Sequence, residues 1–222
     1  MIKATKTSVV QDGESDTILE SLLTGIDKNT ANLQLPDPDL RDFYRDENDR
    51  ILWLTDQIEA DTLIIVRKII YYNRMDKGLP KEERKPIKLF IDTNGGSVAV
   101  MWTLINAILI SKTPVWTINW CECLSAGAHI LAAGHKRFAL PGSTILIHSG
   151  SCVFGGTVEQ ADNAKKYYDS INKQSDALLL KETEIDAKIL KKKSPFDWYL
   201  TPEEALKYKI IDKIVEDFDE IL

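Results

Sequence analysis

The sequence predicts an α/β protein whose parallel or mixed β-sheet is covered by helices. Short β-rich runs alternate with helix-like segments along most of the chain, and this alternation favours such a sheet. Glycine or proline stands at many of the boundaries between these runs. The 222 residues, 44% hydrophobic and 28% charged, suffice for one core and exclude collagen, coiled-coil and fully disordered chains.

The first 48 residues are polar and acidic and carry no sustained apolar period, so we expect a polar N-terminal arm with at most short helices. The folded domain is then expected to span residues 49–222. The start lacks the apolar centre of about 7 to 15 residues that a secretory signal needs. The longest apolar stretch, 98–110, is shorter than the roughly 20 residues of a membrane helix. We therefore expect a cytoplasmic protein that begins near residue 1.

The first half of the predicted domain contains two strands, each followed by a helix. Apolar residues recur at helical spacing within 61–74 and again within 97–111. A β-rich run precedes each of them, and the second run leads directly into Asn94-Gly95-Gly96-Ser97. The predicted order is strand 51–54, helix 61–74, strand 87–91 and helix 97–111.

In the second half, predicted strands and helices alternate again, and a long amphipathic segment lies among them. Thr201-Pro202 followed by a glutamate is a typical helix start. Gly155-Gly156 precedes the long amphipathic segment. So long a helix is expected to protrude from the globular body. The predicted order is strand 115–124, helix 125–133, strands 137–140 and 144–148, helix 158–183, a helix from 201 and strand 210–215.

The charge and the cysteines exclude several classes of protein. A net charge of −6 leaves no electrostatic footprint for nucleic acid. Cys121 and Cys123 lack a second pair at ligand spacing, so we interpret them as small apolar residues rather than half a metal site. We expect no metal and no cofactor, and the chain carries no G-x-x-x-x-G-K-[ST] loop for ATP.

Three histidines, His129, His135 and His148, are available for catalysis. His129 lies one helical turn after Ser125 and is expected to pack, and His135 is expected at the surface. His148 ends an apolar strand beside a loop, where α/β proteins place catalytic groups. Ser125, at a strand-to-helix junction among small residues, is the best candidate nucleophile. The competing interpretation is that it only caps the helix.

Gly95-Gly96 stands at the preceding strand-to-helix junction. Paired glycines also occur where a tight turn is all that is needed. Two such junctions on neighbouring strands would bring the backbone N–H groups of Gly96 and Ala126 together. A tetrahedral oxyanion requires such a pair of donors, and each is typically worth about 10² to 10³ in rate.

Several ordered blocks between about residues 50 and 216 resemble the Clp-type serine peptidases, the ClpP family. They include the two junctions, the strand that ends in His148 and the segment around Thr201. The blocks are FIDTNGGS (90–97), CLSAGA (123–128), LAAG (131–134), FALP (138–141), ILIH (145–148), DWYLTPEEA (197–205) and YKIID (208–212).

The resemblance implies the ClpP/crotonase-like fold of repeated β-β-α units and assigns roles to individual residues. It implies Ser125 as nucleophile, His148 as general base and Asp197 as the residue that orients the histidine. Gly96 and Ala126 would supply the oxyanion hole, and Gly95 with Gly96 would begin a loop that binds an extended substrate. Residues 155–192 would form the family's handle, a helix with its preceding strand, which interlocks two rings.

The implied activity is that of a serine endopeptidase that degrades unfolded polypeptides inside a homo-oligomeric chamber of stacked heptameric rings. The implied partner is a Clp-type ATPase unfoldase, because the chain itself has no ATP-binding loop. Asn94, Ala126 and Ser149-Gly150 stand where the family usually has proline, methionine and Gln-Pro, which indicates a divergent branch. Lys209 stands where a glycine is usual.

Three other functions remain to be weighed. The chain could be a catalytically silent ring subunit that assembles with an active paralogue, if its loops leave the triad unformed. A crotonase-type acyl-CoA enzyme would share the fold and the oxyanion hole, but it needs no serine nucleophile. A relative of the signal-peptide peptidases would use a serine and a lysine, and normally a membrane anchor, which we do not find in this sequence.

Overall fold

The computed structural model describes residues 38–222, so the expectation for residues 1–37 lies outside the described part. Helix α2 (Pro38–Asp49) contains an ion pair between Arg45 and Asp42, 2.8 Å long. Residues 49–222 form a separate compact unit, which is described by itself. No helix within residues 38–222 is both long and apolar enough to cross a bilayer.

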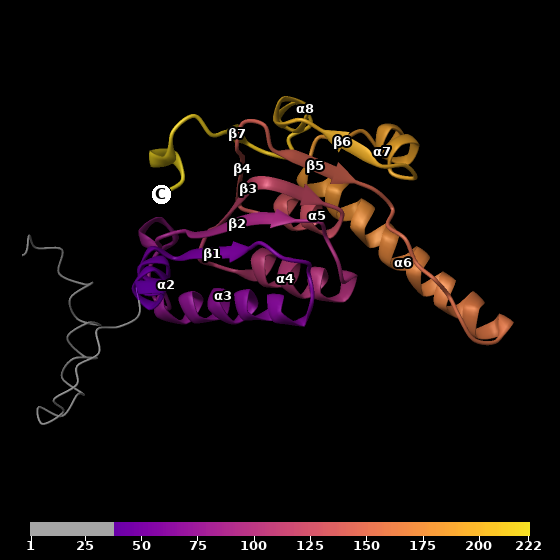
Figure 1. Ribbon diagram of the computed structural model, residues 1–222, viewed down its shortest axis with the longest axis horizontal. Coiled ribbons are helices and arrows are strands. Elements are labelled where there is room, and N and C mark those ends of the chain that lie inside the picture. The colour runs from indigo at the N-terminus through magenta and orange to yellow at the C-terminus, as the bar shows by residue number, and fades with distance from the viewer. Residues whose placement is uncertain (1–37) are drawn as a thin grey trace, which may run out of the picture. The chain divides into compact units, whose positions relative to one another are not determined.

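A mixed sheet organises the unit from residue 49 onward (Figure 1). The order along the sheet is β1-β2-β3-β4-β7, while β5 pairs with β3 and with β6. Every pairing is parallel except that of β5 with β6. The strands in residues 38–222 are β1 (Ile51–Leu54), β2 (Ile87–Thr93), β3 (Val115–Leu124), β4 (Lys136–Ala139), β5 (Thr144–Ile147), β6 (Trp198–Leu200) and β7 (Lys213–Ile214).

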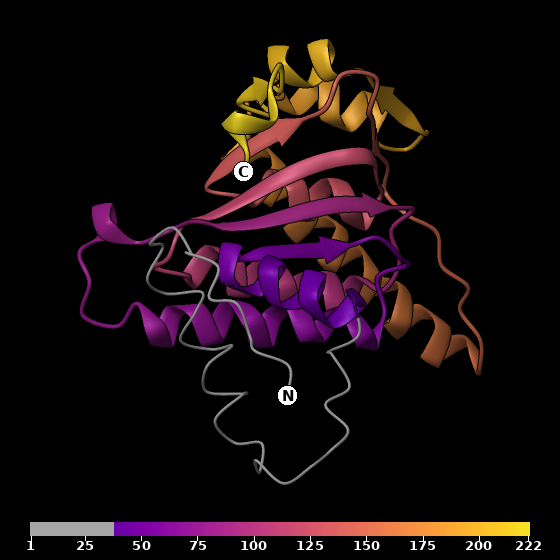
Figure 2. The ribbon, with the colours of Figure 1, turned by 60° about the vertical axis from the view of Figure 1, so that its left-hand side comes forward.

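Helices α3, α4 and α5 cover one face of this sheet, as Figures 1 and 2 both show. They are neighbours in that order, and α5 also contacts α6. The predicted α/β fold, a parallel-rich sheet flanked by helices, is therefore confirmed. The helices are α3 (Leu63–Met75), α4 (Val98–Ile110), α5 (Ala126–Ala132), α6 (Val158–Glu182), α7 (Ala187–Lys193) and α8 (Pro202–Lys207), with short 3-10 turns at Ala60–Thr62, Lys81–Glu83 and Phe218–Glu220.

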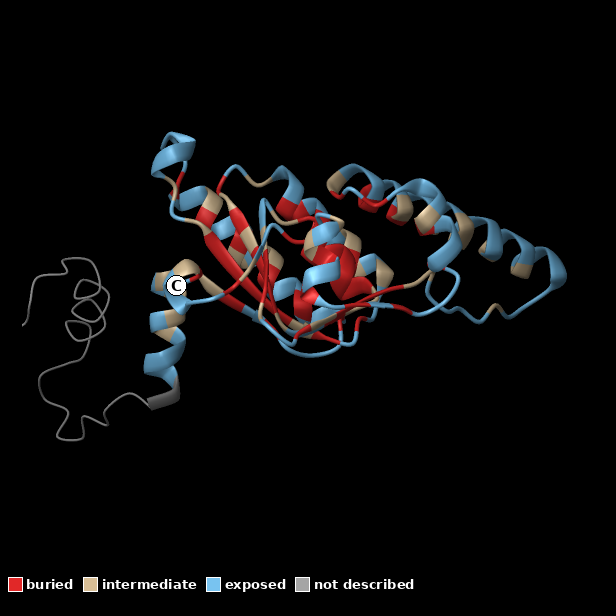
Figure 3. Cartoon of the chain, turned by 90° about the horizontal axis from the view of Figure 1, so that it is seen from above, coloured by how far each residue is buried: buried red, intermediate tan, exposed pale blue. Residues whose placement is uncertain are grey.

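The core is divided between the two faces of the sheet. On β2, Leu89 and Ile91 pack in the cluster shared with the helices, whereas Phe90 belongs to a second cluster. This follows from the strand period of two, which sends successive side chains to opposite faces. Figure 3 shows the buried residues concentrated on the strands and the helices beside them, while most of α6 is exposed. The buried residues of α6 lie in its C-terminal half: Ser175, Leu178 and Leu179.

The long strand β3 has two successive partners on the same side. Its first half pairs with β4, from Trp116 to Asn119. Its second half pairs with β5, with Leu124 opposite Leu146. Strand β5 therefore continues in the same direction as β4, further along β3, instead of running antiparallel to β4. As a result, the residue after β5 is carried to the carboxyl end of β3.

Several predicted elements differ from those in the structure. Strand β7 is shorter than the predicted 210–215, because the N–H of Ile210 bonds to Ala205 and closes helix α8. Strand β6 and helix α7 were not predicted. The strand expected before the handle helix is absent, since residues 149–157 make no strand pairing within the described chain. A strand needs a partner for its backbone groups, and this segment has none in that part of the chain.

Candidate active site

Ser125 stands at the junction between β3 and α5 in a backbone conformation that is rare for a residue with a side chain. Its φ is 55° and its ψ is −117°. Its N–H donates to the carbonyl of Leu146, 2.9 Å away, which ties the junction to β5. Its hydroxyl makes no cap bond to α5 and lies 2.7 Å from Nε2 of His148 instead. The competing interpretation of Ser125 as a helix cap is therefore wrong.

The position of His148 follows from the pairing of β5 with β3. Leu146 lies opposite Leu124, and the two chains continue in parallel to His148 and Ser125. The imidazole then meets a polar group at each of its nitrogens. Nε2 faces the serine hydroxyl, and Nδ1 lies 3.3 Å from Oδ1 of Asp197. This is the arrangement in which a histidine can exchange a proton with a hydroxyl while its second nitrogen is held.

Asp197 is placed by the antiparallel pairing of β6 with β5. Ile147 lies opposite Trp198, so Asp197, the residue just before β6, falls opposite His148. The loop that follows His148 is fixed to the same region, because both the N–H and the hydroxyl of Ser149 donate to the carbonyl of Ser194. The Asp197 side chain is 60% exposed. Its attraction to the imidazole is therefore partly screened by water.

The glycine loop of the preceding junction lies against Ser125. Gly95 accepts from the N–H of Ile58 at 2.8 Å, and the N–H of Ser97 donates back to Ile58 at 2.7 Å. A Cβ on Gly95 would fall 2.8 Å from that of Ser125 and 3.2 Å from the nitrogen of Ala126. Within residues 38–222, neither Gly96 nor Ala126 donates its N–H to an acceptor. Both are backbone donors that a ligand beside Ser125 can use.

His129 lies buried beneath the same junction. Its Nδ1 is 3.0 Å from the carbonyl of Ser125, and since a carbonyl only accepts, the nitrogen must carry the proton. Burial lowers the pKa of His129 and so favours the neutral ring. His135, as expected, is exposed at the surface, and its Nδ1 accepts from the N–H of Val115 at 3.0 Å. The structure thus brings together His148, but not His135, with Ser125.

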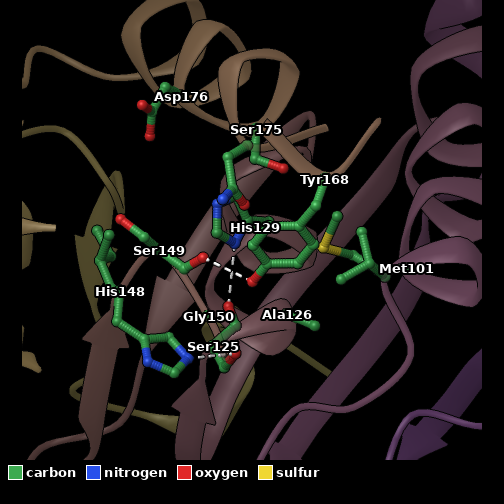
Figure 4. A pocket seen from close by; sticks show the side chains of 13 residues that line it. Met101, Ser125, Ala126, His129, His148, Ser149, Gly150, Tyr168, Ser175 and Asp176 are labelled. Atoms are coloured by element: carbon green, nitrogen blue, oxygen red, sulfur yellow. Dashed lines mark hydrogen bonds between the residues drawn. The ribbon is translucent and has the colours of Figure 1, made fainter. Parts of the chain in front are cut away.

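A small pocket opens beside Ser125 and His148, and much of its wall is contributed by α6 (Figure 4). The four α6 residues in the wall recur at i, i+4, i+7 and i+8, so they share one face of the helix. Our sequence interpretation missed them, because a helical face does not reveal what it packs against. Tyr168 also donates its hydroxyl to the carbonyl of Ser149 at 3.0 Å. The α6 residues are Tyr168, Asn172, Ser175 and Asp176.

None of the three cysteines is among the residues that line this pocket, although Cys152 interacts with Tyr168 of its wall. Cys123 is buried on β3, where burial raises the pKa of its thiol, and Cys121 and Cys152 are exposed. Within the described residues, no three histidine, cysteine, aspartate or glutamate side chains are grouped so that they could hold a metal ion. The Ser125 hydroxyl, the His148 imidazole beside Asp197 and the free backbone N–H groups are together the kinds of group that acyl-transfer chemistry uses.

Comparison with known proteins identifies the family of this chain. A model of the Clp protease family matches residues 41–218. An ATP-dependent Clp protease proteolytic subunit from Deinococcus radiodurans is 30% identical over 171 residues, covering 76% of this chain and 81% of the relative. That degree of identity is consistent with the divergent branch expected from the sequence. The matched range includes most of the described chain, and the chain belongs to the Clp protease family.

Proposed function

We propose that this chain is a serine endopeptidase that hydrolyses peptide bonds of unfolded polypeptides, with residues 49–222 as its peptidase domain. Ser125 is the nucleophile, His148 the general base and Asp197 the residue that orients the histidine. The observation that carries the proposal is the 2.7 Å hydrogen bond between the Ser125 hydroxyl and Nε2 of His148. That contact favours a peptidase over a catalytically silent ring subunit or an acyl-CoA enzyme, neither of which needs it.

The reaction begins when Oγ of Ser125 attacks the scissile carbonyl carbon and Nε2 of His148 takes the hydroxyl proton. Negative charge develops on the carbonyl oxygen, where the N–H groups of Gly96 and Ala126 stabilise it. As the carbon–nitrogen bond breaks, His148 gives its proton to the leaving amine. Water then attacks the acyl-enzyme with His148 as base, and the proton returns to Ser125 as the acid product leaves.

Asp197 holds the proton-bearing Nδ1 of His148 toward itself, so that Nε2 stays free to accept from Ser125. It also stabilises the imidazolium that forms when the serine proton is transferred. Because its side chain is 60% exposed, we assign it mainly the orientation of the ring rather than a large electrostatic contribution.

The proposal includes a homo-oligomeric chamber of stacked heptameric rings and a Clp-type ATPase unfoldase as partner. Support comes from the exposed N-terminal half of α6, which presents apolar side chains such as Val158 and Tyr167. Such a surface is typical of a segment that packs against another subunit. The absence of an ATP-binding loop from the sequence requires that unfolding of substrates be driven by another protein.

The test is degradation of casein, an unfolded polypeptide, by the full chain at each assembly state resolved by native mass. Ser125→Ala and His148→Ala are each expected to lower the rate by at least about 10³-fold. Ser151→Ala, which removes an exposed hydroxyl from the loop after His148, is the matched control and is expected to keep the rate. Degradation that persists in Ser125→Ala would contradict the proposal, as would a wild-type chain that is inactive in every assembly, alone or with a Clp-type ATPase.

A further inference from the structure

We infer that the pocket beside Ser125 selects substrates with lysine or arginine at the residue whose carbonyl is cleaved, through the carboxylate of Asp176. The inference rests on the proposed function and names its substrate class. It is carried by the position of Asp176 in the wall of this pocket, by the pocket's charge and by its apolar sides.

Asp176 reaches the pocket from α6. It lies two turns after Tyr168 on the same helical face, so about 12 Å of α6 runs along the pocket. Figure 4 shows Asp176 on the α6 side, with Ser125 and His148 at the opposite end. A substrate whose carbonyl carbon sits at Ser125 would direct the adjoining side chain along this pocket toward α6. Lysine and arginine carry their charge at the end of a long side chain, which would extend toward this carboxylate.

The pocket holds an acid that nothing in its wall neutralises. Asp176 is the one carboxylate among the described residues of the wall, and none of those residues is lysine or arginine. Within residues 38–222 no ion pair or hydrogen bond to the side chain of Asp176 is formed. Burial raises the pKa of Asp176, as expected for a carboxylate that loses water without gaining a partner. A cation from a substrate would supply that partner.

The two histidines of the wall do not fill this role. His148 is engaged at both nitrogens, with Ser125 and Asp197. His129 is kept neutral, because burial lowers its pKa. The acid is therefore available to a ligand that enters from the side of Ser125.

The sides of the pocket suit the stem of a lysine or arginine. Val98 and Met101 from α4 and Ile147 from β5 contribute apolar surface to the wall of this pocket. Lysine and arginine carry three or four methylene groups that pack on such surface while the charged end reaches a polar group. A carboxylate at the far end of a substrate pocket is known to select these residues in serine proteases. A leucine of the substrate would instead cover Asp176 without pairing it, which disfavours binding.

The first test uses fluorogenic peptides that are identical except at the cleaved residue, which is lysine or its uncharged analogue norleucine. The wild-type chain is expected to prefer lysine in kcat/KM by about 10- to 100-fold, the usual worth of a hydrogen bond to a charged group. Asp176→Asn is expected to remove most of that preference by lowering the lysine rate alone. Asp162→Asn, which removes an exposed acid from the same helix, is the matched control and should keep the preference.

A second test does not depend on catalysis. Fluorescence anisotropy measures binding of two product-like peptides to Ser125→Ala protein, one ending in arginine and one in citrulline, its uncharged analogue. Tighter binding of the arginine peptide, abolished when Asp176→Asn is added, is the expected result. Equal binding of both peptides would overturn the inference.

The two tests separate the inference from the proposed function. Cleavage that depends on Ser125 but shows no preference for lysine would overturn the inference and leave the peptidase intact. Selective binding of the arginine peptide by a chain that cleaves nothing would overturn the proposed function and leave the assignment of Asp176.

Discussion

Ser97 and Ser125 occupy equivalent places, each at the N-cap of a helix that follows a buried strand, yet they do different things. Ser97 has an ordinary extended backbone, with φ −60° and ψ 118°, and its hydroxyl accepts from the N–H of Val100. Ser125 has φ 55° and ψ −117° and makes no cap bond. Its hydroxyl is turned to His148, 2.7 Å away. The hydroxyl of Ser97 therefore caps its helix, whereas the hydroxyl of Ser125 makes no bond to its helix.

The difference shows where the fold accepts backbone strain. A non-glycine residue at positive φ costs on the order of 1 to 3 kcal/mol and persists only where its surroundings enforce it. At Ser125 the enforcement comes from β5 through the Leu146 carbonyl, and from the Gly95 loop packed against its side chain. A serine exposed on such a strained strand-to-helix turn is a recurrent way to present a nucleophile.

The largest expected effect comes from crowding Ser125 with the neighbouring loop. In Gly95→Ala the added methyl group would lie 2.8 Å from the Cβ of Ser125 and 2.9 Å from the carbonyl of Leu124. Because Ser125 or the loop must then move, we expect peptidase kcat/KM to fall by about 10²-fold or more. Peptide hydrolysis by the assembled protein measures it.

Gly78→Ala is the matched control for this change. Gly78 has the same φ as Gly95, 99°, but open space around it. Both variants bear the cost of alanine at positive φ, so the difference between them isolates the crowding of Ser125. Equal activity in the two variants would contradict the tight packing of the glycine loop against the nucleophile.

The next effect compares the two serines directly through stability. Ser97→Ala removes a cap acceptor and is expected to lower the free energy of unfolding by about 1 kcal/mol. Ser125→Ala removes no cap bond, and alanine bears the same positive φ, so its unfolding free energy is expected to stay within about 0.5 kcal/mol of wild type. Urea unfolding at fixed protein concentration checks both. A larger loss in Ser125→Ala than in Ser97→Ala would mean that Ser125 is a cap after all.

Lys209 is another non-glycine residue at positive φ, and it extends the comparison because it lies outside the candidate site. Its φ is 53°, and it follows helix α8, where the bonds from Lys209 to Leu206 and from Ile210 to Ala205 form a Schellman motif. We expect Lys209→Gly to raise the unfolding free energy by up to about 1 kcal/mol, since glycine is the residue this position favours.

Lys207→Gly provides the control, because Lys207 is the last residue of α8 and has helical geometry. The same substitution two residues earlier is expected to cost about 1 kcal/mol of unfolding free energy. If both variants changed stability in the same direction, the strain assigned to Lys209 would not exist.

The last expected effect is a change in pH dependence, and it concerns His129, which donates to the carbonyl of Ser125. Burial holds the pKa of His129 below its ordinary value in the folded chain. Below about pH 6.5 the unfolded chain therefore binds a proton that the folded chain resists, so stability falls as the pH falls. His129→Phe is expected to flatten this slope by up to one proton per chain. An unchanged slope in urea unfolding between about pH 5 and pH 7 would show that His129 is not buried in its neutral form.

The sequence predicted much of the candidate site because the signals for it are local. Ser125 and Gly95-Gly96 stand at strand-to-helix boundaries, and His148 at a strand end, all visible as breaks in an apolar pattern. Asp197 came only from the family resemblance. The strand that aligns it with His148, β6, has three residues and shows no period of its own.

The long-range features were out of reach. Nothing local reveals that β3 pairs first with β4 and then with β5, yet that pairing brings His148 to Ser125. The face of α6 that bears Asp176 has a helical spacing, but its partner surface depends on tertiary packing. The positive φ of Ser125 is imposed by neighbours distant in the sequence and cannot be predicted from a serine. A positive φ at Gly95 can be expected, because glycine is the residue that adopts it readily.

The central claim is that Ser125, activated by His148, is a nucleophile, and labelling with a fluorophosphonate probe tests it most directly. The probe reacts covalently with activated serines, and mass spectrometry locates the modified residue. We predict modification of Ser125 in the assembled wild-type chain, a labelling rate at least about 10²-fold lower in His148→Ala, and an unchanged rate in Ser151→Ala. The account would be contradicted if Ser125 stayed unmodified in every assembly state, or if His148→Ala left its labelling rate unchanged.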